Sequence, residues 1–144
     1  MPHYTGPLLT RPALDAMRNA RASGHETWRG SLDLDRSQRD IALHDDAFVW
    51  GDRTWSFPAR LKDRTIYFHD DADWEPAARF SGALIKLVPT DWGAPTFEID
   101  GIKMLPTAQT SPFDDAQRKV ALIAPAGKTV LDTCGGLGYF AAHC

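Results

Sequence analysis

Apolar residues near the start of the chain recur at helical spacing. Leu14 and Met17 would share one face of a helix that begins after Thr10 and ends before Gly24. Thr10 can accept a hydrogen bond from the first turn, and glycine often follows the last turn of a helix. The pattern therefore predicts a helix over residues 10–23.

From about residue 27 to residue 105 the spacing changes to period two, which is typical of strands with one buried face. Turn residues such as Gly51 and Asp52, or Asp70 and Asp71, separate the apolar runs, and no helical pattern comes between them. This succession indicates an antiparallel meander. The expected strands are residues 40–44 paired with 47–50, followed by 53–57, 65–68, 83–88, 96–99 and 102–105.

Helical spacing returns at Ser111, which can cap a helix that has Pro112 in its first turn. A short apolar segment at 128–133 then reads as a strand, and a glycine-rich turn and a helix start follow it. The expected fold class is α+β. A β-rich antiparallel domain occupies residues 1–106, and residues 107–144 hold the first helix, strand and glycine loop of a further domain.

Composition and charge exclude several classes. The formal net charge of -3 does not favour general binding to nucleic acid. No apolar run approaches the roughly 18 residues that a membrane span needs, and no signal peptide is recognisable. Two cysteines do not form a disulfide framework. We therefore expect a cytoplasmic protein with no membrane partner.

The glycine turn is the candidate cofactor-binding site of the sequence. Gly136 and Gly138 fit the spacing of a dinucleotide-binding loop, because glycine lets a ligand approach the main chain closely. A strand-to-helix turn without any ligand would show the same glycines. Asp132, at the end of the expected strand, disfavours a nicotinamide cofactor, because a buried carboxylate there needs a donor such as an ammonium or hydroxyl group.

Residues 130–139, Val-Leu-Asp-Thr-Cys-Gly-Gly-Leu-Gly-Tyr, resemble motif I of the class I S-adenosylmethionine-dependent methyltransferase superfamily. The stretches 95–104 and 111–120 resemble the lead-in of predicted archaeal, spermine-synthase-like members. The resemblance implies a Rossmann-like domain that binds S-adenosylmethionine. Gly136 and Gly138 would line the methionine and ribose of the cofactor, and Asp132 would lie near its amino group. Cys134 replaces the first glycine of the common motif and completes the candidate set.

The later strands and acceptor loop of a class I domain do not fit after residue 144. We therefore expect a truncated methyltransferase-like chain that is inactive alone, with an unknown acceptor and no identifiable catalytic residue. An aminopropyltransferase-like protein is one alternative. Another alternative is a non-catalytic β-domain that serves as a binding or oligomerisation module. In a homo-oligomer, a partner copy could complete the incomplete Rossmann-like sheet.

Other candidate sites have simpler interpretations. The acidic runs at 44–46 and 69–73 are expected to be solvated turns rather than metal sites. Zinc is not expected, since Cys134, His143 and Cys144 lack a fourth ligand. Nucleic-acid binding by the β-rich domain remains a weaker alternative. It would use tryptophans for base stacking and arginines for phosphate contacts, from the set Trp28, Trp50, Trp55, Trp74, Trp92, Arg29, Arg53, Arg60 and Arg64.

Overall fold

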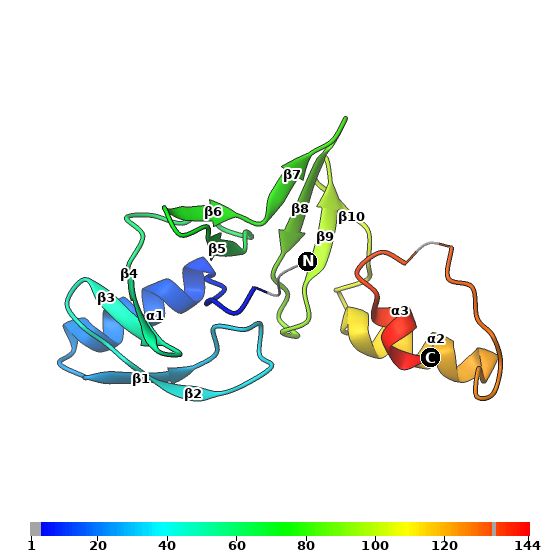
Figure 1. Cartoon of the computed structure of the whole chain (residues 1–144), viewed down its shortest axis with the longest axis horizontal. Helices are drawn as coiled ribbons and strands as arrows, with labels where there is room; N and C mark the ends of the chain where they lie inside the picture. Colours follow the sequence, from blue (N-terminus) through cyan, green and yellow to red (C-terminus); the bar gives the residue numbers. More distant parts are fainter. Residues whose placement is uncertain (1–3, 134) are drawn as a thin grey trace. The chain divides into compact units, whose positions relative to one another are not determined.

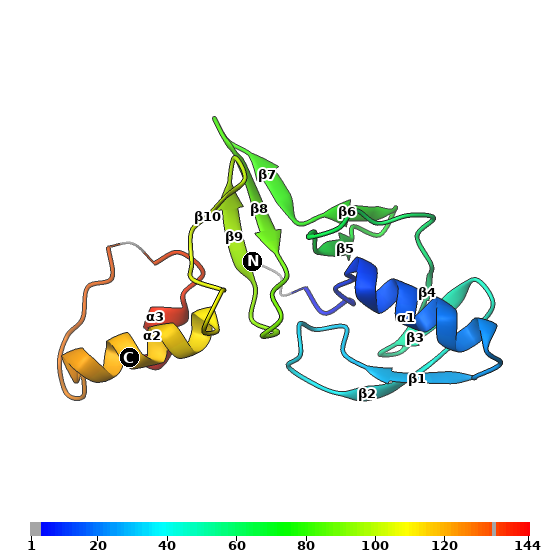
Figure 2. The same cartoon turned by 180° about the vertical axis from the view of Figure 1, so that it is seen from behind.

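The structure is a computed structural model that describes residues 4–133 and 135–144. The chain divides into two compact units, Met1–Arg79 and Phe80–Cys144. Figures 1 and 2 show the elements of each unit from opposite sides. The division expected at 106/107 concerned the start of a cofactor domain, and it stays a prediction.

The N-terminal unit consists of one helix and three antiparallel hairpins. Helix α1 confirms the helix expected at residues 10–23, and the Thr10 hydroxyl accepts a hydrogen bond from the amide of Ala13 at 3.4 Å. The hairpins are β1–β2, β3–β4 and β5–β6. Element bounds are Arg11–Ala22 for α1, Thr27–Gly30 for β1, Arg39–Ala42 for β2, Ala47–Trp50 for β3, Arg53–Ser56 for β4, Tyr67–His69 for β5 and Trp74–Pro76 for β6.

Strand pairing differs from the expected meander, because the described strands form four separate small sheets and β5 pairs with β6, a strand that was not expected. Strand β2 pairs with β1, whereas the expected pairing with β3 is reduced to a bridge between Leu43, just after β2, and Phe48, and to a hydrogen bond from the His44 amide to the Ala47 carbonyl at 2.8 Å. Strand β3 pairs with β4 across a turn at Gly51, as the meander predicts, and the φ of 67° at Gly51 suits glycine. The expected pairing of 40–44 with 47–50 was therefore largely wrong. Alternation of apolar residues identifies the buried face of a strand, but it does not identify the neighbouring strand.

A single apolar core joins these elements. Leu14 and Met17 of α1 are at most 1% exposed and belong to the same cluster as Phe48 of β3. Isolated two-stranded hairpins are at best marginally stable in water, so the hairpins depend on this shared core. The remaining buried members of the cluster are Leu9, Leu32, Ile41, Leu43, Trp50, Trp55, Leu61, Tyr67 and Trp74.

The C-terminal unit contains a small sheet and two helices. The strand order is β10–β9–β8–β7, where β7 (Ala78–Phe80) spans the boundary between the two units, and the β8–β9 hairpin is antiparallel with Val88 opposite Thr96. Helix α2 begins as expected, because the Ser111 hydroxyl accepts a hydrogen bond from the Asp114 amide at 2.9 Å. Element bounds are Ala78–Phe80 for β7, Leu84–Val88 for β8, Thr96–Ile99 for β9, Ile102–Lys103 for β10, Pro112–Ile123 for α2 and Tyr139–His143 for α3.

The strand expected at 128–133 is absent from the described residues. Val130 is 39% exposed and Leu131 is 84% exposed, so these two apolar side chains are not buried as those of a central strand would be. A strand needs neighbours to satisfy its backbone groups, and the described residues offer none here. The coarse fold class is confirmed, since the chain mixes helices with small, mostly antiparallel sheets.

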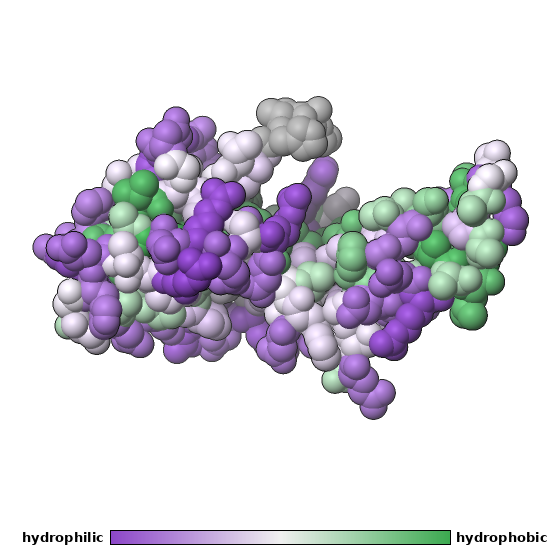
Figure 3. All heavy atoms as spheres, turned by 90° about the horizontal axis from the view of Figure 1, so that it is seen from below, coloured by the Kyte–Doolittle hydropathy of each residue, from purple (hydrophilic) through white to green (hydrophobic). Residues whose placement is uncertain are grey.

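Exposed apolar side chains are unevenly distributed between the units. Apart from Tyr4, each large hydrophobic side chain that is exposed among the described residues lies in the C-terminal unit. Figure 3 shows green, hydrophobic surface on this part of the chain. Among the described residues, no helix has the length and apolar character that a bilayer crossing requires.

Replacement of Phe48 by alanine should destabilise the N-terminal unit by about 3–5 kcal/mol, because a fully buried aromatic side chain leaves a cavity when it is removed. Urea unfolding followed by tryptophan fluorescence measures this loss. The control is Leu122→Ala, at a side chain that is 86% exposed, which should change stability by less than about 0.5 kcal/mol. A loss below about 1 kcal/mol in Phe48→Ala would contradict the core described above.

Candidate functional site

The glycine turn before α3 has the backbone conformation for which glycine is suited. The φ angles are 52° at Gly136 and 78° at Gly138, both in the left-handed region. The amide of Gly138 donates a hydrogen bond to the carbonyl of Gly135 at 2.7 Å and closes the turn. Helix α3 begins at the next residue, Tyr139, as the motif predicts.

Asp132 lies beside this turn. A Cβ atom built on Gly135 would stand 3.9 Å from a carboxylate oxygen of Asp132, and a Cβ atom on Gly138 would meet nothing within 4 Å. Asp132 thus lies near the start of the turn that contains Gly136 and Gly138, and the main chain at Gly138 has open space beside it. The fourth expected cofactor residue, Cys134, lies outside the described residues.

Tyr139, which directly follows the turn, connects it to the rest of the C-terminal unit. Its hydroxyl donates a hydrogen bond to the carbonyl of Pro95 at 2.8 Å. Its ring packs edge to face with that of Phe113 on α2, with ring centres 6.0 Å apart. Burial raises the pKa of Tyr139 to about 12. Sequence analysis did not predict this anchor, because no local pattern relates Tyr139 to Pro95, 44 positions earlier in the chain.

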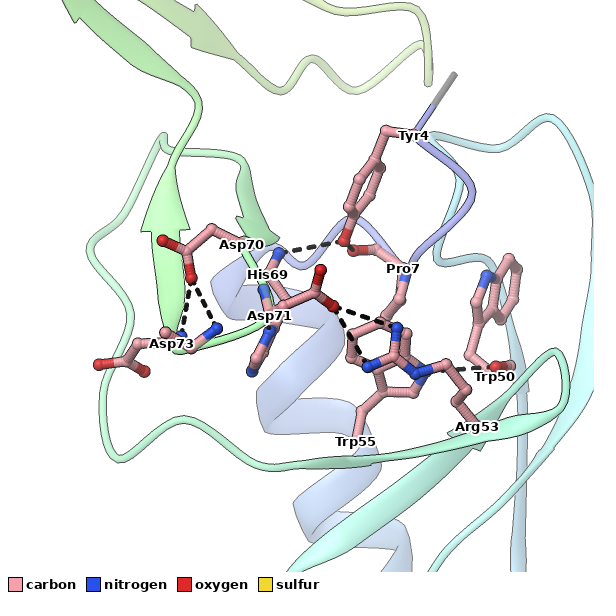
Figure 4. Close-up of polar contacts among 10 residues, drawn as sticks. Tyr4, Pro7, Trp50, Arg53, Trp55, His69, Asp70, Asp71 and Asp73 are labelled. Carbon is pink, nitrogen blue, oxygen red and sulfur yellow. Dashed lines mark hydrogen bonds and ion pairs between the residues drawn. The ribbon is translucent and has the colours of Figure 1, made fainter. Parts of the chain in front are cut away.

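A second candidate site is an open cavity of about 510 Å³ in the N-terminal unit (Figure 4). Four aromatic side chains, Tyr4, Trp50, Trp55 and Phe68, contribute to its walls. The Tyr4 hydroxyl holds one side in place, since it donates to the Pro7 carbonyl and accepts from the His69 amide, each at 3.0 Å. Ligand pockets commonly fall in this range of volume.

Charged side chains surround the aromatic walls. The guanidinium of Arg53 lies 4.5 Å from the ring centre of Trp55 and 3.2 Å from a carboxylate oxygen of Asp71 (Figure 4). The backbone amides of Asp73 and Ala72 donate hydrogen bonds to Asp70 and lower the pKa of its carboxyl group. Asp52 also lines the cavity.

The hydrogen bonds to Asp70 also show the structure of the acidic run at 69–73. Asp70 accepts both amides at 2.9 Å and so closes a local turn, which confirms the turn interpretation. Among the described residues, no three side chains of His, Cys, Asp or Glu are grouped in a way that could hold a metal ion.

Three of the five tryptophans expected to stack on bases are in the core instead. Trp50, Trp55 and Trp74 are 8%, 6% and 9% exposed, so they serve the core and are not available for the weaker alternative of base stacking. Arg29, which was assigned to phosphate contacts, lies 3.3 Å from Asp40. Nucleic-acid binding by other residues stays a prediction.

Comparison with known proteins gives one informative match. The chain is 44% identical over 77 residues to the uncharacterized protein MJ1233 of Methanocaldococcus jannaschii, and the match covers 53% of this chain and 26% of that protein. The chain thus matches about a quarter of the length of this relative. No family model matches the chain, and no solved structure matches it.

The raised pKa of Tyr139 can be tested by counting phenolates at pH 11. The neutral phenol is favoured in the folded state, so its stabilising contribution is complete below pH 10 and is lost as the pH rises from 10 towards 12. Absorbance at 295 nm should therefore give nearly equal phenolate counts for the native chain and Tyr139→Phe at pH 11. An excess of about one phenolate in the native chain, with circular dichroism showing a retained fold, would contradict the assignment.

Proposed function

We propose that residues 128–144 supply motif I of an S-adenosylmethionine-binding domain, and that the protein belongs with the class I methyltransferases. The observation that carries this proposal is the glycine turn itself. Two left-handed glycines follow Asp132 and lead directly into a helix. The order of acidic residue, glycine turn and helix is that of the cofactor loop which the sequence resembles.

The space around the turn fits such a cofactor. Gly138 has open space where a Cβ atom would lie, so the main chain is accessible to a ligand. The carboxylate of Asp132 is close enough to the turn to meet the amino group of a methionine moiety bound there. Asp132, Gly136 and Gly138 would hold the cofactor, which supplies an electrophilic methyl group on its sulfonium when bound.

The segment before the turn has the character of a strand that lacks its neighbours. Val130 and Leu131 are apolar yet exposed, and a central strand of a parallel sheet would bury both faces. A Rossmann-like sheet that includes residues 128–133 would bury these side chains. In this proposal the role of the chain is to position the cofactor, since transfer of a methyl group depends mainly on the alignment of the sulfonium with the acceptor.

Titration with S-adenosylhomocysteine, followed in ¹H–¹⁵N correlation spectra, tests the proposal. We expect shifts centred on residues 132–139 and a dissociation constant in the micromolar range. Asp132→Ala should weaken binding by about tenfold or more, because it removes an ionic hydrogen bond to the ligand. Asp91→Asn, at an exposed aspartate in a different turn, is the matched control and should bind as the native chain does.

Gly138→Ala is the complementary variant, since a left-handed alanine costs about 1–2 kcal/mol and should distort the turn. Gly101→Ala introduces the same backbone strain at a φ of 84° in the β9–β10 turn, away from the loop, and should leave ligand affinity unchanged. Shifts produced equally by NAD⁺ would favour the dinucleotide alternative. A folded chain with no shift at millimolar S-adenosylhomocysteine would contradict the proposal.

A further inference from the structure

The cavity in the N-terminal unit combines aromatic walls with an excess of negative charge. Three aspartates, Asp52, Asp70 and Asp71, line it against one arginine, Arg53. The carboxyl group of Asp70, whose pKa is lowered by hydrogen bonds from the Asp73 and Ala72 amides, is ionised at neutral pH, as an ordinary aspartate is. Both the aromatic rings and the carboxylates therefore favour a positively charged group.

The chain's own arginines already show how this surface holds a cation. Arg53 stacks on Trp55 at 4.5 Å while its guanidinium pairs with Asp71 at 3.2 Å. Arg39 lies 4.8 Å from the ring centre of Trp50, another residue of the cavity wall. A positive group between an aromatic ring and a carboxylate is thus the binding mode that the fold itself uses here (Figure 4).

Two further aromatic rings, those of Tyr4 and Phe68, line the cavity. Tyr4 and Phe68 meet edge to face, with ring centres 5.8 Å apart, and Asp70 directly follows His69. The Tyr4 hydroxyl is engaged by Pro7 and His69, which fixes the orientation of its ring. An anion would meet three carboxylates and an arginine that already has a carboxylate partner.

We propose that this cavity binds a small organic cation, through a guanidinium or primary ammonium group held between the aromatic walls and the carboxylates of Asp52, Asp70 and Asp71. The volume of about 510 Å³ fits a small molecule. This site is independent of the glycine turn, and its test does not depend on the cofactor proposal.

Three probes that share a butyl chain separate charge from hydrophobic contact. Butylguanidinium, the neutral butylurea and the anionic butyrate are titrated into the ¹⁵N-labelled chain, and the amides of Gly51, His69 and Asp71 are followed. We expect butylguanidinium to bind at least tenfold more tightly than butylurea, and we expect butyrate to cause no saturable shift. Equal binding of butylurea, or saturable binding of butyrate, would overturn the proposal.

Substitution of Arg53 distinguishes a cation site from an anion site by the sign of the effect. Arg53→Met removes the resident positive charge and exposes the face of Trp55, so butylguanidinium should bind several-fold more tightly. At an anion site the same change would weaken binding of an anion and leave butylguanidinium unaffected. Weaker binding of butylguanidinium by a folded Arg53→Met chain would therefore overturn the proposal.

Asp71→Asn should weaken butylguanidinium binding at least threefold, because it removes one carboxylate and releases Arg53 to repel the ligand. Asp45→Asn is its matched control, since Asp45 is another exposed aspartate paired with an arginine, Arg21, at 2.6 Å and does not line the cavity. The control should change the affinity by less than twofold. Equal losses in both variants would overturn the proposal.

A short blocked peptide, Gly-Arg-Gly, tests the source of the cation. Binding of the peptide no tighter than butylguanidinium would support a free small molecule as the ligand. A peptide affinity more than tenfold higher would assign the cavity to the side chain of a protein partner and overturn the small-molecule proposal.

Discussion

The N-terminal unit depends on one shared apolar core, because none of its three hairpins has enough paired strands to be stable alone. Phe48 lies at the centre of this dependence. Its ring is fully buried and lies 5.5 Å from Phe57 and 6.2 Å from Trp74, so it connects β3 to the segment after β4 and to β6. Helix α1 contributes Leu14 and Met17 to the same cluster. The cavity proposed for an organic cation is lined by residues of two of these hairpins and therefore exists only when the core is assembled.

The C-terminal unit depends more on local interactions, and several of its apolar side chains stay exposed. Its sheet and α2 form, but the apolar segment at 128–133 has no strand to pair with and remains exposed among the described residues. The glycine turn forms nevertheless, because its left-handed angles depend on glycine and on one local hydrogen bond rather than on a sheet. Tyr139 adds a tertiary anchor through Pro95.

The two proposed sites differ in the physical basis of recognition. At the glycine turn, accessible main chain and one carboxylate would hold a cofactor that carries its own reactive group. In the cavity, aromatic faces and carboxylates would hold a positive charge, as they already hold Arg53. The relative from Methanocaldococcus jannaschii has no described function, so both proposals rest on the residues of this chain.

Local features were determined by the sequence alone. The caps at Thr10 and Ser111, the turns at Gly51 and Asp70, and the order of Asp132, glycine turn and helix follow from interactions between residues close in the chain. Tertiary structure decided the rest, since pairing and burial depend on distant neighbours. It paired β2 with β1, placed Trp55 in the core and left Leu131 exposed. It also brought Arg53 to Asp71, a contact that spans 18 positions and leaves no periodic trace in the sequence.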